Sequence, residues 1–244
     1  MRNVKVVVEY DGTDYFGFQY QPNVPTIQGE LERALAEILK EQVTVIGSGR
    51  TDAGVHAAGQ VVNFRTEGSI PTDRVCAAMN SLLPRSIAAL QAEEVDERFH
   101  ARFSAKSRLY RYDILNRETR SALLGRFCLH VPKALDVDAM AEAGRCLAGV
   151  HDFSSFASAD AEDESPVRNL MQFDVRRSGQ RVILDFRANA FLRSMVRVIV
   201  GTLVEVGLGR RDAGEVKSIL EAGDRRVAGK TAPPHGLCLT EVEY

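Results

Sequence analysis

The chain has 244 residues, enough for one large domain or two small ones, and its 45% apolar and 26% charged residues are ordinary for a globular protein. No run of about 18 apolar residues marks a membrane span, and the first residues lack an apolar signal-peptide core, so we expect a cytoplasmic protein without a membrane partner. The net charge of −2 lacks the basic balance of many nucleic-acid-binding domains, so such a surface would require local clusters of the 31 lysines and arginines.

The cysteines indicate no metal site. Four cysteines are widely separated along the chain, and no two of them form a C-x-x-C pair. No set of histidines, cysteines and carboxylates has ligand spacing either, and no nucleotide-binding loop is present. We therefore expect neither a metal nor a cofactor.

The first part of the chain predicts alternating strands and helices. Val4, Val6 and Val8 have the period of a strand, and an apolar face beginning at Ile27 predicts a helix that Thr26 caps. Pro84 ends a second helix. In this part we expect strands at 4–10, 43–46, 60–64 and 87–95 and helices at 27–40 and 71–83.

Residues 98–103 are expected to form a hinge, after which the pattern of strands and helices begins again. The pattern predicts two similar α/β lobes, 1–102 and 103–244, with joined sheets and a cleft between them. The acidic run 160–164 is expected to be a mobile surface loop. In the second lobe we expect strands at 106–115, 167–176, 180–187 and 237–244 and helices at 137–147, 190–206 and 212–222.

The glycine-rich stretch 47–56 carries an arginine and a carboxylate two residues apart, Arg50 and Asp52. Asp52 can act as a nucleophile, a base or a metal ligand, and Arg50 suits a phosphate or a base stack. A tight turn with a local ion pair explains the same residues, since turns are rich in glycine, aspartate and threonine. On the residues alone both interpretations stay open.

Two further residues are candidates from their positions. Tyr110 shares one strand face with Tyr112 and Ile114, where a tyrosine is most often part of the core. Arg197 lies in an apolar helix, where a charge requires a partner. We favour Asp52 as that partner, with Glu205 or Asp185 at a solvent edge as the alternative.

Several motifs, in order along the whole chain, resemble those of the TruA family of tRNA pseudouridine synthases. They are Y-D-G-T-D-Y-F-G-F-Q-x-Q from Tyr10, G-R-T-D-A-G-V-H-A from Gly49, F-x-A-R-F-S-A-x-x-R-x-Y-R-Y from Phe99, H-D-F-S-S-F from His151, F-L-x-x-M-V-R-x-I-V-G-T-L from Phe191 and T-A-P-x-x-G-L from Thr231. The resemblance implies an α+β pseudouridine synthase fold with mainly antiparallel sheets, outer helices and a central active-site cleft.

By this resemblance Asp52 is the catalytic carboxylate, Tyr110 stacks on the target uracil and Leu237 lines the uracil pocket. Arg197 would orient Asp52, and our hypothesis is that Arg50 replaces the flipped base. The expected RNA-contact residues are Arg50, Arg102, Arg108, Arg111, His151, Arg168 and Arg193.

The family acts as a homodimer on positions 38, 39 and 40 of the tRNA anticodon stem-loop, and we expect the same partners here. Two other functions are compatible with parts of the sequence. A non-catalytic tRNA-binding or remodelling protein would need the basic residues but not Asp52, and a hydrolase would use Asp52 with His56. We interpret His56 and His100 as structural residues rather than ligands.

Overall fold

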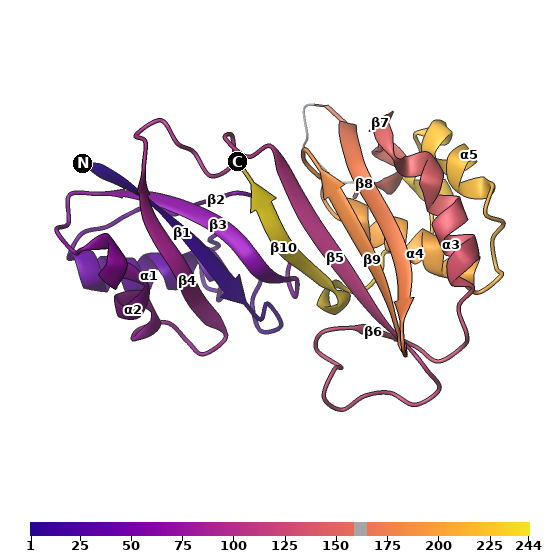
Figure 1. Ribbon diagram of the computed structural model, residues 1–244, viewed down its shortest axis with the longest axis horizontal. Coiled ribbons are helices and arrows are strands. Elements are labelled where there is room, and N and C mark those ends of the chain that lie inside the picture. Colours follow the sequence, from indigo (N-terminus) through magenta and orange to yellow (C-terminus); the bar gives the residue numbers. More distant parts are fainter. Residues whose placement is uncertain (159–164) are drawn as a thin grey trace. The chain divides into compact units, whose positions relative to one another are not determined.

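The computed structural model describes residues 1–158 and 165–244, so the predicted acidic loop at 160–164 lies outside the described residues. The chain divides into two compact units, drawn in Figure 1. The first comprises Met1–Lys106 together with Cys238–Tyr244, and the second comprises Ser107–Leu237. The C-terminal strand thus belongs to the first unit by compactness, whereas a functional division at 102/103 remains a prediction.

The sheet of the first unit is built around β1 (Arg2–Tyr10). This strand pairs antiparallel with both β3 (His56–Thr66) and β4 (Ile87–Val95). On the other side of β3 lie the antiparallel β2 (Ile46–Gly47) and the parallel β10 (Leu237–Glu243). Strand β1 is central because it is paired along both edges, and Val4, Val6 and Val8 are fully buried as their spacing predicted.

Helices α1 (Ile27–Leu39) and α2 (Thr72–Asn80) pack together in the first unit (Figure 1). The predicted cap is confirmed, because the Thr26 hydroxyl oxygen accepts a hydrogen bond from the Gly29 amide at 3.2 Å. Helix α1 ends where Lys40 enters the left-handed region, at φ 57°.

The predicted strand at 43–46 was wrong except at its last residue. Side chains of α1 are hydrogen-bonded to both backbone groups of Val45: the Glu32 carboxylate accepts from its amide at 2.9 Å, and the Gln28 amide donates to its carbonyl at 3.2 Å. Those bonds satisfy the backbone groups that a strand partner would otherwise bind. The strand predicted at 60–64 instead begins at His56.

The second unit contains an antiparallel run β5 (Ser107–Asn116), β9 (Arg181–Ala188), β8 (Val167–Ser178) and β7 (Gly149–Asp152). A short β6 (Leu129–Val131) pairs parallel with β5. The helices are α3 (Val137–Gly144), α4 (Met195–Gly207) and α5 (Glu215–Ala222), and 3₁₀ turns cover Arg145–Leu147, Ser154–Phe156, Arg225–Val227 and Pro234–Gly236. The fold class is therefore α+β with mostly antiparallel strand pairs, as predicted.

Several predicted boundaries in the second unit were wrong. The helix expected from residue 190 begins at Met195, because Ser194 has a left-handed backbone with φ 61° that a helix cannot contain. The helix expected over 137–147 changes to a 3₁₀ turn after Gly144, and the one expected from 212 begins at Glu215. No helix in the described ranges has the length and apolar character that crossing a membrane requires.

Candidate active site

The Asp52 loop, defined here as Ser48–Val55, joins β2 to β3 and packs against the aromatic segment Gly12–Phe18. Two backbone hydrogen bonds connect them, from the Phe18 amide to the Thr51 carbonyl at 3.0 Å and from the Gly54 amide to the Tyr15 carbonyl at 3.3 Å. A third bond, from the Val55 amide to the Asp52 carbonyl at 3.1 Å, closes a turn around Asp52 itself. The loop is therefore fixed through its backbone on both sides of Asp52.

The two polar side chains of the loop differ in exposure. Arg50 is exposed and Asp52 is half-buried. A carboxylate at the surface of a tightly bonded turn can meet a substrate without a rearrangement of the loop. Arg50, two residues earlier, can reach into solvent toward a phosphate or a base.

His56 lies at the end of the loop and is buried. Its Nδ1 accepts a hydrogen bond from the Gly12 amide at 3.0 Å and lies 3.2 Å from an Asp11 carboxylate oxygen. These contacts support the structural interpretation of His56, since the ring joins the loop to the end of β1. In the described part of the chain, no group of three histidine, cysteine or acidic side chains could hold a metal ion.

Tyr110 lies on β5, opposite Phe186 of β9 and half-buried. Its ring makes an edge-to-face contact with Phe191, with the ring centroids 5.1 Å apart and the planes at 84°. Tyr112 and Ile114 on the same strand face are fully buried, as the period-two pattern predicted. Tyr110 thus lies where this buried row of side chains becomes partly accessible.

Arg197 is half-buried on α4 and is joined to the chain segment 230–237. Its Nε donates to the Ala232 carbonyl at 2.9 Å, and the Ala232 amide donates to the Arg197 carbonyl at 3.0 Å. Leu237 follows a 3₁₀ turn at the end of this segment and is buried. The second unit therefore brings the Arg197 motif and the Leu237 motif together. The two hydrogen bonds to Arg197 hold the segment 230–237 against α4.

Tyr112 is also in contact with the segment 230–237. Its hydroxyl donates to the Pro233 carbonyl at 2.8 Å, and a Cβ on Gly236 would lie 2.6 Å from the Tyr112 ring. Burial raises the pKa of the Tyr112 phenol, while the charge of Arg197 acts in the opposite direction. The phenol stays neutral and remains a donor to the main chain.

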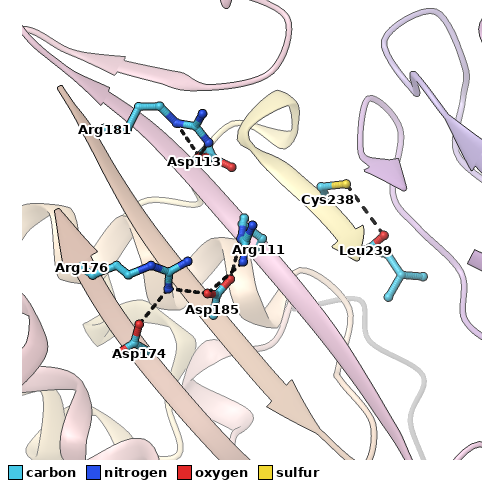
Figure 2. A network of polar contacts seen from close by, with 8 residues as sticks. All are labelled: Arg111, Asp113, Asp174, Arg176, Arg181, Asp185, Cys238 and Leu239. Carbon is cyan, nitrogen blue, oxygen red and sulfur yellow. Dashed lines mark hydrogen bonds and ion pairs between the residues drawn. The ribbon is translucent and has the colours of Figure 1, made fainter. Parts of the chain in front are cut away.

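Asp185, one of the alternative partners of Arg197, is the centre of an ion-pair network (Figure 2). The Arg111 guanidinium donates to both of its carboxylate oxygens, at 2.8 and 3.2 Å, and Arg176 donates at 2.5 Å. Burial raises the pKa of Asp185, but its hydrogen bonds to the two arginines outweigh burial and hold the pKa below the usual value. Glu205, the other alternative, pairs with Arg211 at 3.2 Å.

The expected RNA-contact residues fall into two groups. Arg50, Arg102 and Arg193 are exposed, and the Arg102 guanidinium lies 5.6 Å from the centroid of the Phe103 ring. By contrast, other candidates bind main-chain carbonyl oxygens: buried Arg108 at 2.7 Å, half-buried Arg168 at 2.7 and 2.8 Å, and half-buried His151 at 2.9 Å. Arg111 is bound to Asp185.

The sequence reasoning missed the polar side chains beneath the Asp52 loop. Tyr10 is predicted as a strand residue and the start of a motif, and Gln60 as the start of a strand, yet both make hydrogen bonds to the loop. No local pattern around Gln60 indicates this contact, because its partners Ser48 and Gly49 lie on the preceding loop.

A model of the tRNA pseudouridine synthase family matches residues 6–104 and 143–244. Proteins called tRNA pseudouridine synthase A are similar over nearly the whole chain. Those of Brevibacillus brevis and a Thermoanaerobacter species are 49% and 44% identical over 244 residues, which is 100% of this chain and of each relative. That of Halalkalibacterium halodurans is 49% identical over 97% of this chain and 90% of its own.

The protein is thus an RNA-modifying isomerase. The chain belongs to the TruA family of tRNA pseudouridine synthases, and its reaction is the isomerisation of uridine in tRNA. This assignment confirms the resemblance of the motifs and decides against both alternatives, the hydrolase and the non-catalytic binding protein.

Proposed function

We propose that the enzyme modifies positions 38, 39 and 40 in the anticodon stem-loop of tRNA and that Asp52 is its catalytic carboxylate. The observation that carries the assignment of Asp52 is the loop geometry: a half-buried carboxylate in a turn with backbone hydrogen bonds on both sides. The motif around it supports the same role through its resemblance to the family signature.

The chemistry is an exchange of bonds within one nucleotide. The N1–C1′ bond of uridine breaks, the uracil turns, a C5–C1′ bond forms, and the proton leaves C5 while N1 gains one. Oxidation state and water are unchanged overall, so the protein must mainly supply a carboxylate, a place for the detached base and protection from solvent. Asp52 would add to the sugar or the base, or remove a sugar proton, and each route begins with an ionised carboxylate.

The remaining roles are proposed for residues of the motifs that resemble those of the family. Arg197 would orient Asp52, while Tyr110 and Leu237 would hold the uracil as it turns. Support for this grouping comes from the second unit, where α4 and the 230–237 segment are hydrogen-bonded to each other. Arg50, exposed beside Asp52, would fill the space left by the flipped base.

The proposal includes a cytoplasmic homodimer in which one tRNA contacts both subunits. A dimer would present two copies of the exposed arginines, Arg102 and Arg193 among them, to one polyanion. The doubled basic surface would help a chain with a net charge of only −2 to bind one tRNA. Sedimentation of the protein with and without tRNA measures this stoichiometry directly.

The test uses unmodified tRNA with uridine at position 39, incubated with wild-type protein, Asp52→Asn or Asp73→Asn. Asp73 is a matched control because it is an exposed carboxylate on α2 in the same unit. Pseudouridine is mapped by its carbodiimide adduct, which stops primer extension, and binding is measured by gel shift.

We expect a stop with wild type and Asp73→Asn and none with Asp52→Asn, while all three bind tRNA. A stop that persists with Asp52→Asn refutes the role of Asp52. Product at another nucleotide, with none at positions 38 to 40 of suitable tRNAs, refutes the proposed target.

A further inference from the structure

Four polar side chains within or next to the Asp52 loop are almost completely buried. Their exposed fractions are 4% for Tyr10, 1% for Ser48, 5% for Thr51 and 0% for Gln60. Buried polar groups destabilise a fold unless each finds a partner, so their presence here requires an explanation. We call these four residues the loop network.

Gln60 holds the first part of the loop. Its Oε1 accepts from the Ser48 hydroxyl at 2.6 Å, and its Nε2 donates to the Gly49 carbonyl at 2.9 Å. The amide orientation is determined by these contacts, because the opposite orientation would place its oxygen against the Gly49 carbonyl. One side chain on β3 thus fixes the two residues before Arg50.

Tyr10 holds the loop at the residue before Asp52. Its hydroxyl lies 2.8 Å from the Thr51 hydroxyl, and the Gln60 Nε2 lies 3.5 Å from the same phenolic oxygen. Burial raises the pKa of Tyr10, so the phenol stays neutral and keeps its hydrogen-bonding proton at every working pH. The side chain comes from the end of β1, a different strand from Gln60.

The contacts follow a pattern along the loop. Its hydrogen bonds reach residues 48, 49 and 51, which lie on both sides of exposed Arg50 and directly before half-buried Asp52. These hydrogen bonds restrict the backbone conformation on both sides of Arg50 and directly before Asp52. An apolar filling of the same space would bury the loop without selecting one backbone conformation.

We infer that Tyr10 and Gln60 are positioning residues for the isomerisation, acting on Asp52 and Arg50 through the loop network. The inference rests on the proposed catalytic role of Asp52. Misplacement of a reacting group by about 1 Å can lower a rate about 100-fold. Loss of a network contact should therefore lower kcat, whereas KM for tRNA, set by a large charged surface, should change little.

The same pair of strands contains a matched control network away from the loop. The Asn63 side chain donates to the Asn3 carboxamide oxygen at 2.9 Å and accepts from the Ala101 amide at 2.9 Å. Asn3 in turn donates to two main-chain carbonyls, and both asparagines are buried. A substitution there disturbs a buried polar network of the same unit without contact to the Asp52 loop network.

The experiment compares Tyr10→Phe, Gln60→Met and the control Asn63→Leu for kcat, KM and unfolding midpoint in urea. We expect kcat to fall about 10- to 100-fold in the first two with KM within about twofold, and Asn63→Leu to keep its kcat while losing stability. Thr51→Ser, which keeps the hydroxyl, should retain most of the rate, and Thr51→Val should behave like Tyr10→Phe.

Two results would overturn the inference while leaving the role of Asp52 intact. One is full kcat in Tyr10→Phe and Gln60→Met when Asp52→Asn is inactive. The other is an equal loss of kcat in Asn63→Leu at equal loss of stability, which would reduce the network to a purely structural one. Activity in Asp52→Asn refutes the proposed catalytic role of Asp52, and it leaves the network no catalytic group to position.

Discussion

Gly201 in the middle of α4 offers a test in which two physical effects have opposite signs. Alanine in place of glycine in a helix interior usually stabilises a protein by about 1 kcal/mol. At this position, however, a Cβ would lie 1.7 Å from the Lys230 carbonyl oxygen, far inside the contact distance. The segment that begins at Lys230 would have to move by more than an ångström, and Gly201→Ala should destabilise the protein.

The magnitude follows from what that movement breaks. The Ala232 amide and carbonyl are both hydrogen-bonded to Arg197, at 3.0 and 2.9 Å, and each bond contributes about 1 kcal/mol. Residual overpacking adds about 1–3 kcal/mol, and the helix preference of alanine returns about 1 kcal/mol. We expect a net loss of about 2–4 kcal/mol in the free energy of unfolding.

Urea unfolding followed by circular dichroism measures this loss. Gly214 provides the control, since it has a helical backbone with φ −65° and no atom within 4 Å of an added Cβ. Gly214→Ala should leave the unfolding midpoint unchanged or slightly raised. A raised midpoint for Gly201→Ala would refute the close approach between α4 and the Lys230 segment.

Three other substitutions test single contacts by the same unfolding assay. Asp185→Asn should lower the free energy of unfolding by about 1–3 kcal/mol at pH 7. Because the pKa of Asp185 is lowered in the folded protein, the difference in stability between wild type and variant should shrink as the pH falls below about 4. A constant difference in stability down to about pH 3 would contradict the ion pairing. Thr26→Ala removes the cap of α1 and should cost about 1 kcal/mol, and Thr26→Ser should restore most of it, a contrast that a mere packing role would not produce. Tyr112→Phe leaves the Pro233 carbonyl without its donor and should cost about 1–2 kcal/mol, so an unchanged midpoint would show that water replaces the hydroxyl.

The sequence predicted the elements whose signals are long and periodic. Strand β1 and helix α1 were found because their apolar residues recur at 2 and at 3.6 residues and a capping residue marks the helix start. Strands β6 and β7, with three and four residues, are too short to have a period, and both were missed. The failed strand at 43–46 was apolar enough, but its backbone partners are side chains of α1, which no local pattern reveals.

For the candidate site, the motifs indicated the residue types. The structure shows which charged side chains are already bound to other groups of the protein. Arg108 and Arg111 looked like RNA ligands because they lie in a basic run, yet one binds a main-chain carbonyl and the other binds Asp185. Both partners are distant in sequence, 81 and 74 residues away. A charge count along the chain cannot contain this information.

The aromatic segment Gly12–Phe18 and the Asp52 loop in the first unit pack closely against each other. A Cβ on Gly12 would lie 2.0 Å from the Val55 carbonyl oxygen, and one on Gly17 would lie 2.9 Å from the Thr51 carbonyl oxygen. Each glycine thus lets one motif approach the other more closely than any side chain would permit. Because the aromatic segment and the Asp52 loop can close only together, a substitution at Gly12 should disturb the loop as directly as one within it.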